Sequence, residues 1–189
     1  MSIHDCFNPE RIQLQTEELT LRLLQQTDAD KLFDYFNQLS ATTRQYFAPH
    51  PFDQTTVASI CATLNPAELV RLVVSDGSDA RILAYTLLLN GTTPSDTRRL
   101  EALGIELDLA TDCSLAPSIA DAYQSQGLGK PIMEKVLSIA RATGKKRIIL
   151  WGGVQAANQR AVSYYQKFGF LKIKEFERNG PNYDMWLTL

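Results

Sequence analysis

A pair of glycines and a lysine stand where an apolar-periodic stretch begins. Residues 124–130 read QSQGLGK, and Pro131 follows directly. A helix amino terminus presents unpaired N–H groups and a partial positive charge, so a glycine-rich entry loop is suited to hold an anion. Gly127 and Gly129 let a phosphate approach the backbone, and Pro131 has no N–H to lose at the first helical position. The pattern predicts an anion-binding loop; a plain turn rich in glycine is the alternative.

Two common nucleotide-binding patterns do not fit this loop. A P-loop requires G-x-x-x-x-G-K-[S/T], but Gln124 stands at its first glycine and Pro131 at its magnesium-binding hydroxyl. A dinucleotide fingerprint requires G-x-G-x-x-G, and Ile132 stands at its third glycine. ATP and NAD sites of these types are therefore disfavoured.

A second pattern lies further along, in the stretch NQRAVSYYQKFGF. Asn158, Ala161 and Tyr165 are spaced i, i+3 and i+7, which places them on one face of a helix that ends at Gly169. Asn158 also suits a helix N-cap, and both roles are compatible. Tyr165 is either a functional hydroxyl or a core tyrosine, and Tyr164, one step round the helix, is expected to pack.

The sequence predicts one α+β domain over residues 1–189 with a mixed sheet and a loose segment at 1–15. Thr27 or Asp28 is expected to cap the first helix, and residues 90–97, with the sequence NGTTPSDT, are expected to form a loop. The other expected helices are 55–64, 131–143 and one ending at Gly169, and the expected strands are 18–24, 69–75, 81–89, 104–110, 113–120, 147–151, 170–176 and 183–189.

Composition excludes several classes of protein. With 44% apolar residues, 21% charged residues and a net charge of −2, the 189-residue chain is globular and lacks the basic surface of a nucleic-acid binder. Lys145 to Arg147 form one short basic cluster, expected to be a solvated helix end. Cys6, Cys61 and Cys113 have no C-x-x-C spacing, which disfavours a disulfide framework or a zinc site. The start of the chain resembles no signal peptide, and no apolar run is long enough to span a membrane. We expect a cytoplasmic protein without a metal.

The order and spacing of the two patterns resemble the GNAT superfamily of N-acetyltransferases. That signature is [Q/R]-x-x-G-x-[G/A] at the start of a helix, then a strand, then N-x-x-A-x-x-x-Y-x-x-x-G-F. The motifs cover about residues 115–170, and the order of elements upstream also suits the family. The stretch LTLRLLQQTDADKLFDYF resembles the branch that includes ribosomal-protein N-terminal acetyltransferases. The resemblance implies a mostly antiparallel sheet with a splayed parallel strand pair, about four flanking helices, and acetyl-CoA as co-substrate.

The resemblance also implies roles for the motif residues. Backbone groups near Ile119, on the splayed strand, would pair with pantetheine. The N–H groups of residues 126–130 would hold the pyrophosphate, with Gln124 ordering the loop and Lys130 reaching either a phosphate or solvent. Asn158 would contact the cofactor arm, and Tyr165 would protonate the departing thiolate. The predicted cofactor-binding set is Pro117, Ser118, Ile119, Gln124, Ser125, Gln126, Gly127, Leu128, Gly129, Lys130, Asn158 and Tyr165.

The implied reaction is direct attack of a neutral amine on the acetyl carbonyl, whose oxygen is polarised by backbone N–H groups of the splayed strand. A general base is expected, but the family's glutamate positions hold Gly153 and Leu115 here. The remaining candidates are Glu101, Glu106, Asp108, Asp112, Asp184 and His50, and the base stays unassigned. His50 lies where the family often lines its acceptor site, whereas His4 is expected to be an ordinary terminal residue.

The acceptor is expected to be a small-molecule amine or a protein or peptide N-terminus. Tyr46, Phe47 and Phe52 are expected to line its pocket or to join the core. A homodimer is possible by analogy with the family. An acyl-CoA-binding sensor or interaction module with little transfer is the alternative function, and a longer acyl group in place of acetyl stays open.

Overall fold

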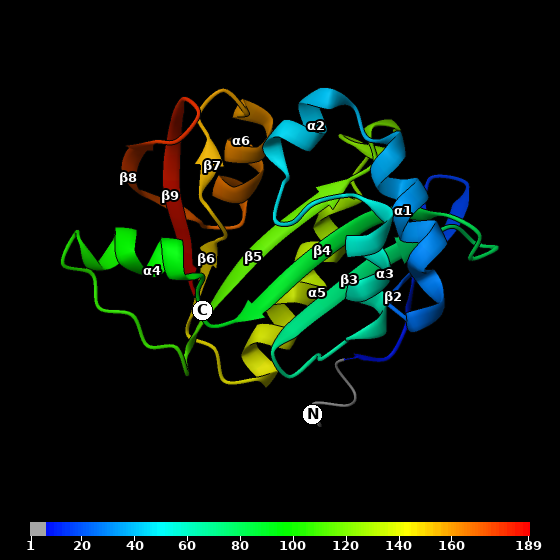
Figure 1. Ribbon diagram of the computed structural model, residues 1–189, viewed down its shortest axis with the longest axis horizontal. Helices are drawn as coiled ribbons and strands as arrows, with labels where there is room; N and C mark the ends of the chain where they lie inside the picture. The colour runs from blue at the N-terminus through cyan, green and yellow to red at the C-terminus, as the bar shows by residue number, and fades with distance from the viewer. Residues whose placement is uncertain (1–6) are drawn as a thin grey trace.

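The protein folds around one mixed β-sheet with helices on both faces (Figure 1). The computed structural model describes residues 7–189, so His4 and Cys6 lie outside the described part. The strands are β1 (Glu10–Leu14), β2 (Glu17–Leu23), β3 (Leu69–Ser75), β4 (Ile82–Asn90), β5 (Asp112–Ile119), β6 (Arg147–Leu150), β7 (Val154–Gln155), β8 (Leu171–Glu177) and β9 (Pro181–Thr188). The helices are α1 (Ala29–Gln38), α2 (Ala41–Tyr46), α3 (Gln54–Ala62), α4 (Pro94–Glu101), α5 (Gly129–Ala142) and α6 (Gln159–Lys167), with short 3-10 turns at Gln26–Asp28 and Asp121–Tyr123.

Neighbouring strands run antiparallel except for β5 and β6. The order across the sheet is β1-β2-β3-β4-β5-β6-β9-β7, with β8 beside β9. The parallel pair requires a long crossover, which α5 provides. β6 and β7 lie in line along one side of β9, and β8 pairs along the other. The predicted α+β fold, mostly antiparallel with one parallel pair, is confirmed.

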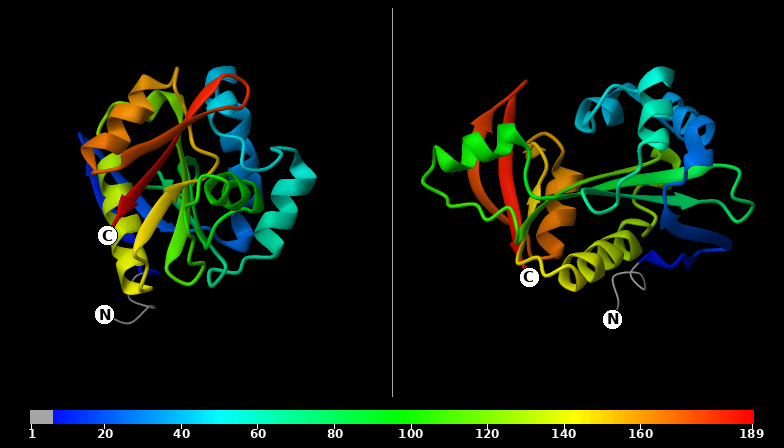
Figure 2. Two further views of the ribbon diagram at one scale, coloured as in Figure 1. Left: turned by 90° about the vertical axis from the view of Figure 1, so that its left-hand side faces the viewer. Right: turned by 60° about the horizontal axis from the view of Figure 1, so that its bottom comes forward.

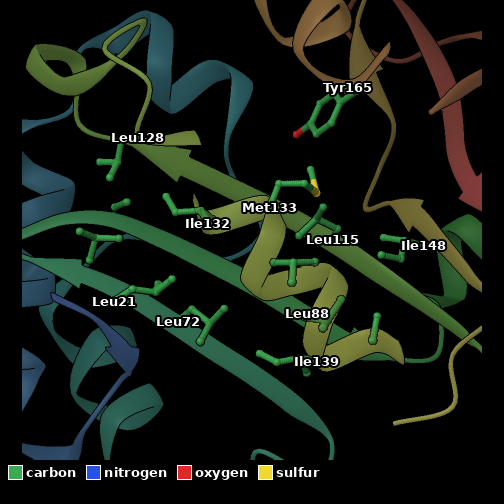
Figure 3. Close-up of a cluster of buried hydrophobic side chains, with 14 of the residues drawn as sticks. Leu21, Leu72, Leu88, Leu115, Leu128, Ile132, Met133, Ile139, Ile148 and Tyr165 are labelled. Atoms are coloured by element: carbon green, nitrogen blue, oxygen red, sulfur yellow. The ribbon is translucent and has the colours of Figure 1, made fainter. Parts of the chain in front are cut away.

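The two faces of the sheet carry separate hydrophobic clusters. Figure 2 shows α5 against one face and α1 to α3 against the other. On the α5 face, Met133 and Ile139 pack with Leu72 and Leu115 (Figure 3). On the opposite face, Phe36 of α1 belongs to a cluster with α3 and with strands β3 and β4. The central strands are therefore buried on both sides, and they hold the site rigidly.

Helix α5 begins earlier than the sequence predicts. Its buried residues recur at helical spacing, among them Ile132, Val136 and Ile139, and Gly144 follows its end at φ 72°. Gly129 is its first residue, so Pro131 is the third and not the first. The missing N–H still falls within the first turn, where no intrahelical acceptor exists, and it therefore costs no hydrogen bond.

Several other expectations are corrected. Residues 10–14 form β1, so the segment 1–15 is not loose throughout, and residues 104–110 form a loop with turns and not a strand. The predicted loop at 90–97 contains the start of α4, because Thr93 accepts a hydrogen bond from the Asp96 N–H at 3.1 Å and a proline follows it. Asp28 occupies the N-cap position of α1, but its carboxylate binds Arg22 at 2.6 Å instead of capping the helix.

Helix α2 is a further addition to the predicted elements. No helix is predicted for residues 41–46, but Ser40 caps α2 there by accepting the Thr43 N–H at 3.2 Å. Six α-helices in the described residues thus exceed the expected four, and α2 and α4 are short.

Within residues 7–189, no helix combines the length and apolarity that a membrane span requires. The same residues contain no group of three or more His, Cys, Asp or Glu side chains arranged to hold a metal ion.

Candidate functional site

A cleft opens where β5 and β6 separate. Residues 112–115 pair with residues 147–150, and the last contact is the Trp151 N–H donating to the Leu115 carbonyl at 2.9 Å. Gly153, at φ 73°, then turns the chain before β7 resumes pairing with β9. The resulting cleft has a volume of about 720 Å³. Figure 1 shows α6 on one side of this end of β5 and α2 on the other.

The free edge of β5 presents few hydrogen-bonding groups. The Ala120 N–H donates to the Leu83 carbonyl of β4 at 2.8 Å. Because backbone groups alternate along a strand, Pro117 and Ile119 must face the cleft. Pro117 offers a carbonyl and no N–H, and the Ile119 carbonyl already accepts the Gln124 side-chain amide at 2.8 Å. The edge therefore presents one free acceptor, at Pro117, and one free donor, at Ile119.

This orientation also explains a proline in an interior strand. The sequence predicts an edge or a bulge for Pro117, because proline cannot donate to a ladder. β5 pairs with β4 on one side, and the missing N–H faces the other side, where the strands have separated. No ladder hydrogen bond is lost.

Gln124 connects three parts of the site. Its amide nitrogen donates to the Ile119 carbonyl and, at 3.2 Å, to the Thr43 hydroxyl of α2. Asp121 supports the same junction, since its carboxylate accepts the Ser40 N–H at 2.9 Å and the Thr43 hydroxyl at 2.7 Å. The glycine-rich loop, the end of β5 and α2 are thereby fixed to one another.

The loop before α5 has the geometry of an anion cradle. Ser125 and Gly127 both adopt left-handed conformations, at φ 62° and φ 96°. Space is open where a side chain on Gly127 would project, so its backbone conformation, and not crowding, calls for glycine. Within the described residues, no backbone acceptor pairs with the N–H groups of residues 126–129, whereas the Lys130 N–H donates to the Gly127 carbonyl at 3.2 Å. Four free donors at the start of a 14-residue helix fit an anionic group.

Gly129 is required for a different reason. A Cβ at this position would lie 2.7 Å from the ring of Tyr164. The Tyr164 hydroxyl also donates to the Gly129 carbonyl at 2.7 Å. Tyr164 therefore does more than pack, because it joins α6 to the first turn of α5.

Asn158 is the N-cap of α6. Its side-chain oxygen accepts the Ala161 N–H at 3.2 Å, and its own N–H donates to the Gln155 carbonyl at 2.9 Å. The capping role that the sequence predicts for it is thus present. Asn158 also lines the cleft.

Tyr165 reaches the cleft from the buried face of α6. Its side chain extends from α6 toward β5 (Figure 3) and is 7% exposed. Burial raises the pKa of its hydroxyl above the usual tyrosine range, so the proton stays on the oxygen at neutral pH. Burial alone accounts for this shift, with no hydrogen bond among its causes, and Tyr165 lines the cleft, so its hydroxyl is placed to donate to a ligand there.

The structure brings most of the predicted site residues together. Two do not line the cleft: Leu128 is buried beneath the loop, and Gln126 donates its side-chain amide to the Ala122 carbonyl. The predicted residues that do line it are Pro117, Ser118, Ile119, Gln124, Ser125, Gly127, Gly129, Lys130, Asn158 and Tyr165.

The acidic candidates for a general base lie elsewhere. Asp112 is held by Arg147 at 2.9 Å, and Asp184 is held by Arg99 at 2.7 Å. Asp108 accepts backbone and hydroxyl hydrogen bonds within its own turn. Glu101 and Glu106 are exposed. These residues are not among those that line the cleft.

His50 belongs to an aromatic cluster and not to the cleft lining. Its Nδ1 lies 2.8 Å from the Pro51 carbonyl, and its ring meets Phe36 edge-on at 5.4 Å between centroids. Burial lowers its pKa, opposed in part by the contact with Pro51, so the imidazole is neutral at pH 7. Phe52 stacks on Phe36 in the same cluster, whereas Tyr46 and Phe47 do line the cleft.

Sequence reasoning missed part of the lining. The capping pair Ser40 and Thr43 is the signal that would have revealed α2, whereas the other positions carry no motif. The missed residues are Thr43, Ala116, Ile132, Leu150, Trp151, Gly153, Val154, Gln155, Arg160, Ser163, Tyr164, Lys167 and Phe168.

Comparisons with known proteins agree with this geometry. The model of the acetyltransferase (GNAT) family matches residues 115–170. The L-amino acid N-acyltransferase MnaT of Escherichia coli (strain K12) is 27% identical over 67 residues, which are 35% of this chain and 38% of that protein. An uncharacterized N-acetyltransferase of Mycobacterium tuberculosis (strain ATCC 25618 / H37Rv) is 29% identical over 152 residues, which are 76% of this chain and 83% of the relative.

Solved structures share the fold over nearly the whole chain. The GNAT domain of S. lividans PAT has a TM-score of 0.74 at 18% identity, covering 96% of this chain and 97% of that domain. The ribosomal-protein-S5-alanine acetyltransferase from Vibrio fischeri has a TM-score of 0.74 at 14% identity, covering 96% of both chains. The aminoglycoside acetyltransferase AAC(6')-Ib in complex with coenzyme A has a TM-score of 0.64 at 18% identity, covering 90% and 94%. Residues 115–170 thus match the model of the GNAT family, as the motifs predict, and the chain has the fold of GNAT structures.

Proposed function

We propose that the protein transfers the acetyl group of acetyl-CoA to a primary amine. One observation carries the proposal: a single cleft is lined by Tyr165 and by Gly127 and Gly129, which supply two of the four free N–H groups at the start of α5. An anion site and a proton donor on one extended groove suit a ligand with a pyrophosphate at one end and a thioester at the other. The names of the relatives, and a neighbour of the same fold in complex with coenzyme A, support this class of reaction.

The same geometry suggests which residues hold the co-substrate. The N–H groups of residues 126–129, with Lys130 beside them, would bind the pyrophosphate. The Pro117 carbonyl and the Ile119 N–H would pair with a pantetheine amide, in the manner of an added strand. The Asn158 amide nitrogen would contact the arm.

The reaction would proceed by direct attack. The amine nitrogen bonds to the acetyl carbonyl carbon, and the carbonyl electron pair moves to oxygen. When the pair returns, the carbon–sulfur bond breaks, and the thiolate is stabilised or protonated by the Tyr165 hydroxyl. An amine that arrives as ammonium first gives its proton to a base or to water, and the released products are the amide and CoA.

The acceptor remains a small amine or a protein or peptide N-terminus. The relatives and neighbours are named for an L-amino acid, an aminoglycoside and an alanine of a ribosomal protein, all of which carry amines. The ionisable side chains that line this cleft include Lys130, Arg160 and Lys167, and Tyr46 and Phe47 add aromatic surface. Assembly as a homodimer stays a prediction.

An acyl-CoA-binding module with little transfer is the second candidate. The observation that favours it is the position of the candidate bases, which lie outside the cleft lining. The Tyr165 hydroxyl favours the enzyme, since binding alone has no use for a proton donor at that position.

The melting temperature with and without acetyl-CoA tests the proposal, with ATP and NAD as controls. At a ligand concentration about a hundredfold above Kd, binding stabilises the fold by roughly 2.7 kcal/mol, a shift of several degrees. A shift with ATP or NAD but none with acetyl-CoA or CoA contradicts the proposal. Where acetyl-CoA binds, Tyr165→Phe is expected to lower kcat with an unchanged Kd for CoA, and an unchanged kcat would favour the binding module.

A further inference from the structure

We propose that Pro117 withholds a catalytic hydrogen bond. Its ring removes the backbone donor that β5 would otherwise direct at the acyl carbonyl oxygen, and it thereby slows transfer, while the anion site and the Ile119 N–H still bind acyl-CoA. The inference rests on the proposed function and identifies a residue that sets its rate.

The backbone N–H groups at the closed end of the cleft are already engaged. Trp151 donates to the Leu115 carbonyl at 2.9 Å, and Gly153 donates to the Leu150 carbonyl at 3.1 Å. The Gly152 N–H donates to the Asp96 carboxylate at 3.0 Å. The β6 side therefore leaves no free N–H at residues 151–153.

On the β5 side, the position that faces this end is Pro117. Residue 115 is the last to pair with β6, so the next position of the same orientation is residue 117. Proline has no N–H, and the next donor, at Ile119, lies two residues further along, about 6.6 Å away toward the anion site. The only backbone group that residue 117 turns to the cleft is a carbonyl, and a carbonyl oxygen has no hydrogen to donate.

The chemistry makes this position important. Attack on the thioester places negative charge on the carbonyl oxygen, and a preorganised donor there typically accelerates acyl transfer by about 10²–10³. The anion site lies at the open end of the groove, so an extended acyl-CoA bound there directs its thioester toward the closed end. A donor restored at residue 117 would meet that oxygen.

The proline is not required by the sheet. Residue 117 sits opposite Thr86 in a pair whose backbone groups point away from one another, so β4 receives no hydrogen bond from this N–H whichever residue is present. Pro117→Ala therefore adds a donor to the cleft without changing the ladder. The accompanying loss of backbone restriction in the unfolded chain should lower Tm slightly.

The test compares the wild type with Pro117→Ala, using acetyl-CoA labelled with ¹³C at its carbonyl. Isotope-edited infrared spectroscopy reports polarisation of the bound carbonyl, and calorimetry gives Kd for acetyl-CoA and for CoA, which lacks this carbonyl. We expect the carbonyl band to move to lower frequency, the affinity for acetyl-CoA to rise relative to that for CoA, and kcat to rise about tenfold or more. Pro181→Ala, the same change at an exposed position of β9 outside the cleft, should alter none of these.

An unchanged band and an unchanged affinity ratio in Pro117→Ala would overturn the inference, even if the protein proves to be an acetyltransferase. A wild type that binds neither acetyl-CoA nor CoA would instead overturn the proposed function, and the inference with it. If Pro117→Ala does not fold, as judged by its melting curve, then Pro117→Gly repeats the test with the same N–H. Failure of both variants to fold would make the ring structural and would reject the proposal.

Discussion

The two halves of β5 differ more than their shared strand suggests. Residues 112–115, the closed half, are hydrogen-bonded to β4 and β6, and their side chains are buried. Residues 116–119, the open half, keep β4 but lose β6, and Ile119 is partly exposed in the cleft. The closed half is stabilised by packing and pairing, whereas the open half exchanges pairing with a strand for the capacity to pair with a ligand.

The cause of the separation lies on the β6 side. Gly152 and Gly153 take left-handed conformations between β6 and β7, which moves this part of the chain away from β5. Asp96 of α4 is fully buried and accepts the Gly152 N–H, while Arg99 joins Asp96 to Asp184 of β9. A helix that the sequence analysis misses therefore holds the bend that opens the cleft.

The largest expected effect is a loss of stability from a change in the closed half of β5, Asp112→Ala. The Asp112 side chain is 3% exposed, and it pairs with Arg147, which is 19% exposed. Removing the carboxylate leaves a largely buried guanidinium without its partner, so the free energy of unfolding should fall by roughly 3–5 kcal/mol. Urea denaturation measures the change.

The difference between the two halves of β5 predicts that Asp112→Ala lowers the stability of the fold but does not weaken the binding of acetyl-CoA. The fraction of Asp112→Ala that remains folded should bind acetyl-CoA with the Kd of the wild type, because Asp112 does not line the cleft. A weaker Kd at full folding would mean that the closed half also shapes the ligand site, and the distinction between the two halves would fail.

Gly153→Ala is expected to lower the stability of the fold and also to weaken the binding of acetyl-CoA. A Cβ at Gly153 would lie 2.8 Å from the Phe176 ring and from the Tyr183 carbonyl, at φ 73°. The left-handed conformation alone costs about 1–2 kcal/mol with a side chain, and the overlap adds roughly 1–3 kcal/mol. The bend should shift, and the Kd for acetyl-CoA should rise along with the loss of stability.

Gly180→Ala is the matched control for the bend. Gly180 has φ 100° and nothing within 4 Å of an added Cβ, and it is not among the residues that line the cleft. Gly180→Ala should therefore lose only the stability that its positive φ costs, with no cost from overlap, and it should bind acetyl-CoA with the Kd of the wild type. Equal losses of stability and of acetyl-CoA affinity in the two variants would show that the close packing around Gly153 does not maintain the bend.

Sequence patterns predict best where a local rule decides the structure. The glycine-rich loop, the apolar spacing of α5 and the Asn158 cap of α6 depend on residues within a few positions of one another. The central strands follow from their alternating or continuous apolar runs. These elements carry the motif residues, so the general position of the cleft is predictable.

What faces the cleft is not predictable in this way. Whether Pro117 or its neighbour Ser118 points a backbone group at the gap depends on the register with β4, and a shift of one residue would reverse it. The contact between Tyr164 and Gly129 joins residues that are 35 positions apart. Such facts depend on tertiary pairing, which no local pattern encodes.

The smallest expected effect is in the open half, with Tyr164→Phe. This change removes the hydroxyl that donates to the Gly129 carbonyl but keeps the ring against the glycine. A hydrogen bond of this kind contributes about 1 kcal/mol, so the first turn of α5 should be held less firmly and the Kd for CoA should rise about fivefold. S-acetylpantetheine, which lacks the pyrophosphate, should react with unchanged KM and kcat.

A loss that affects only the substrate with a pyrophosphate distinguishes a weakened anion site from a general destabilisation of the fold. Tyr123→Phe removes another tyrosine hydroxyl, one that donates to Glu17 at 3.0 Å outside the cleft lining, and should change neither substrate's constants. Equal losses for acetyl-CoA and S-acetylpantetheine in Tyr164→Phe would mean that the hydroxyl supports the fold of α6 as a whole. A loss for acetyl-CoA alone would mean that the open half divides further, with one neighbouring tyrosine serving the anion site and the other, Tyr165, serving the thioester.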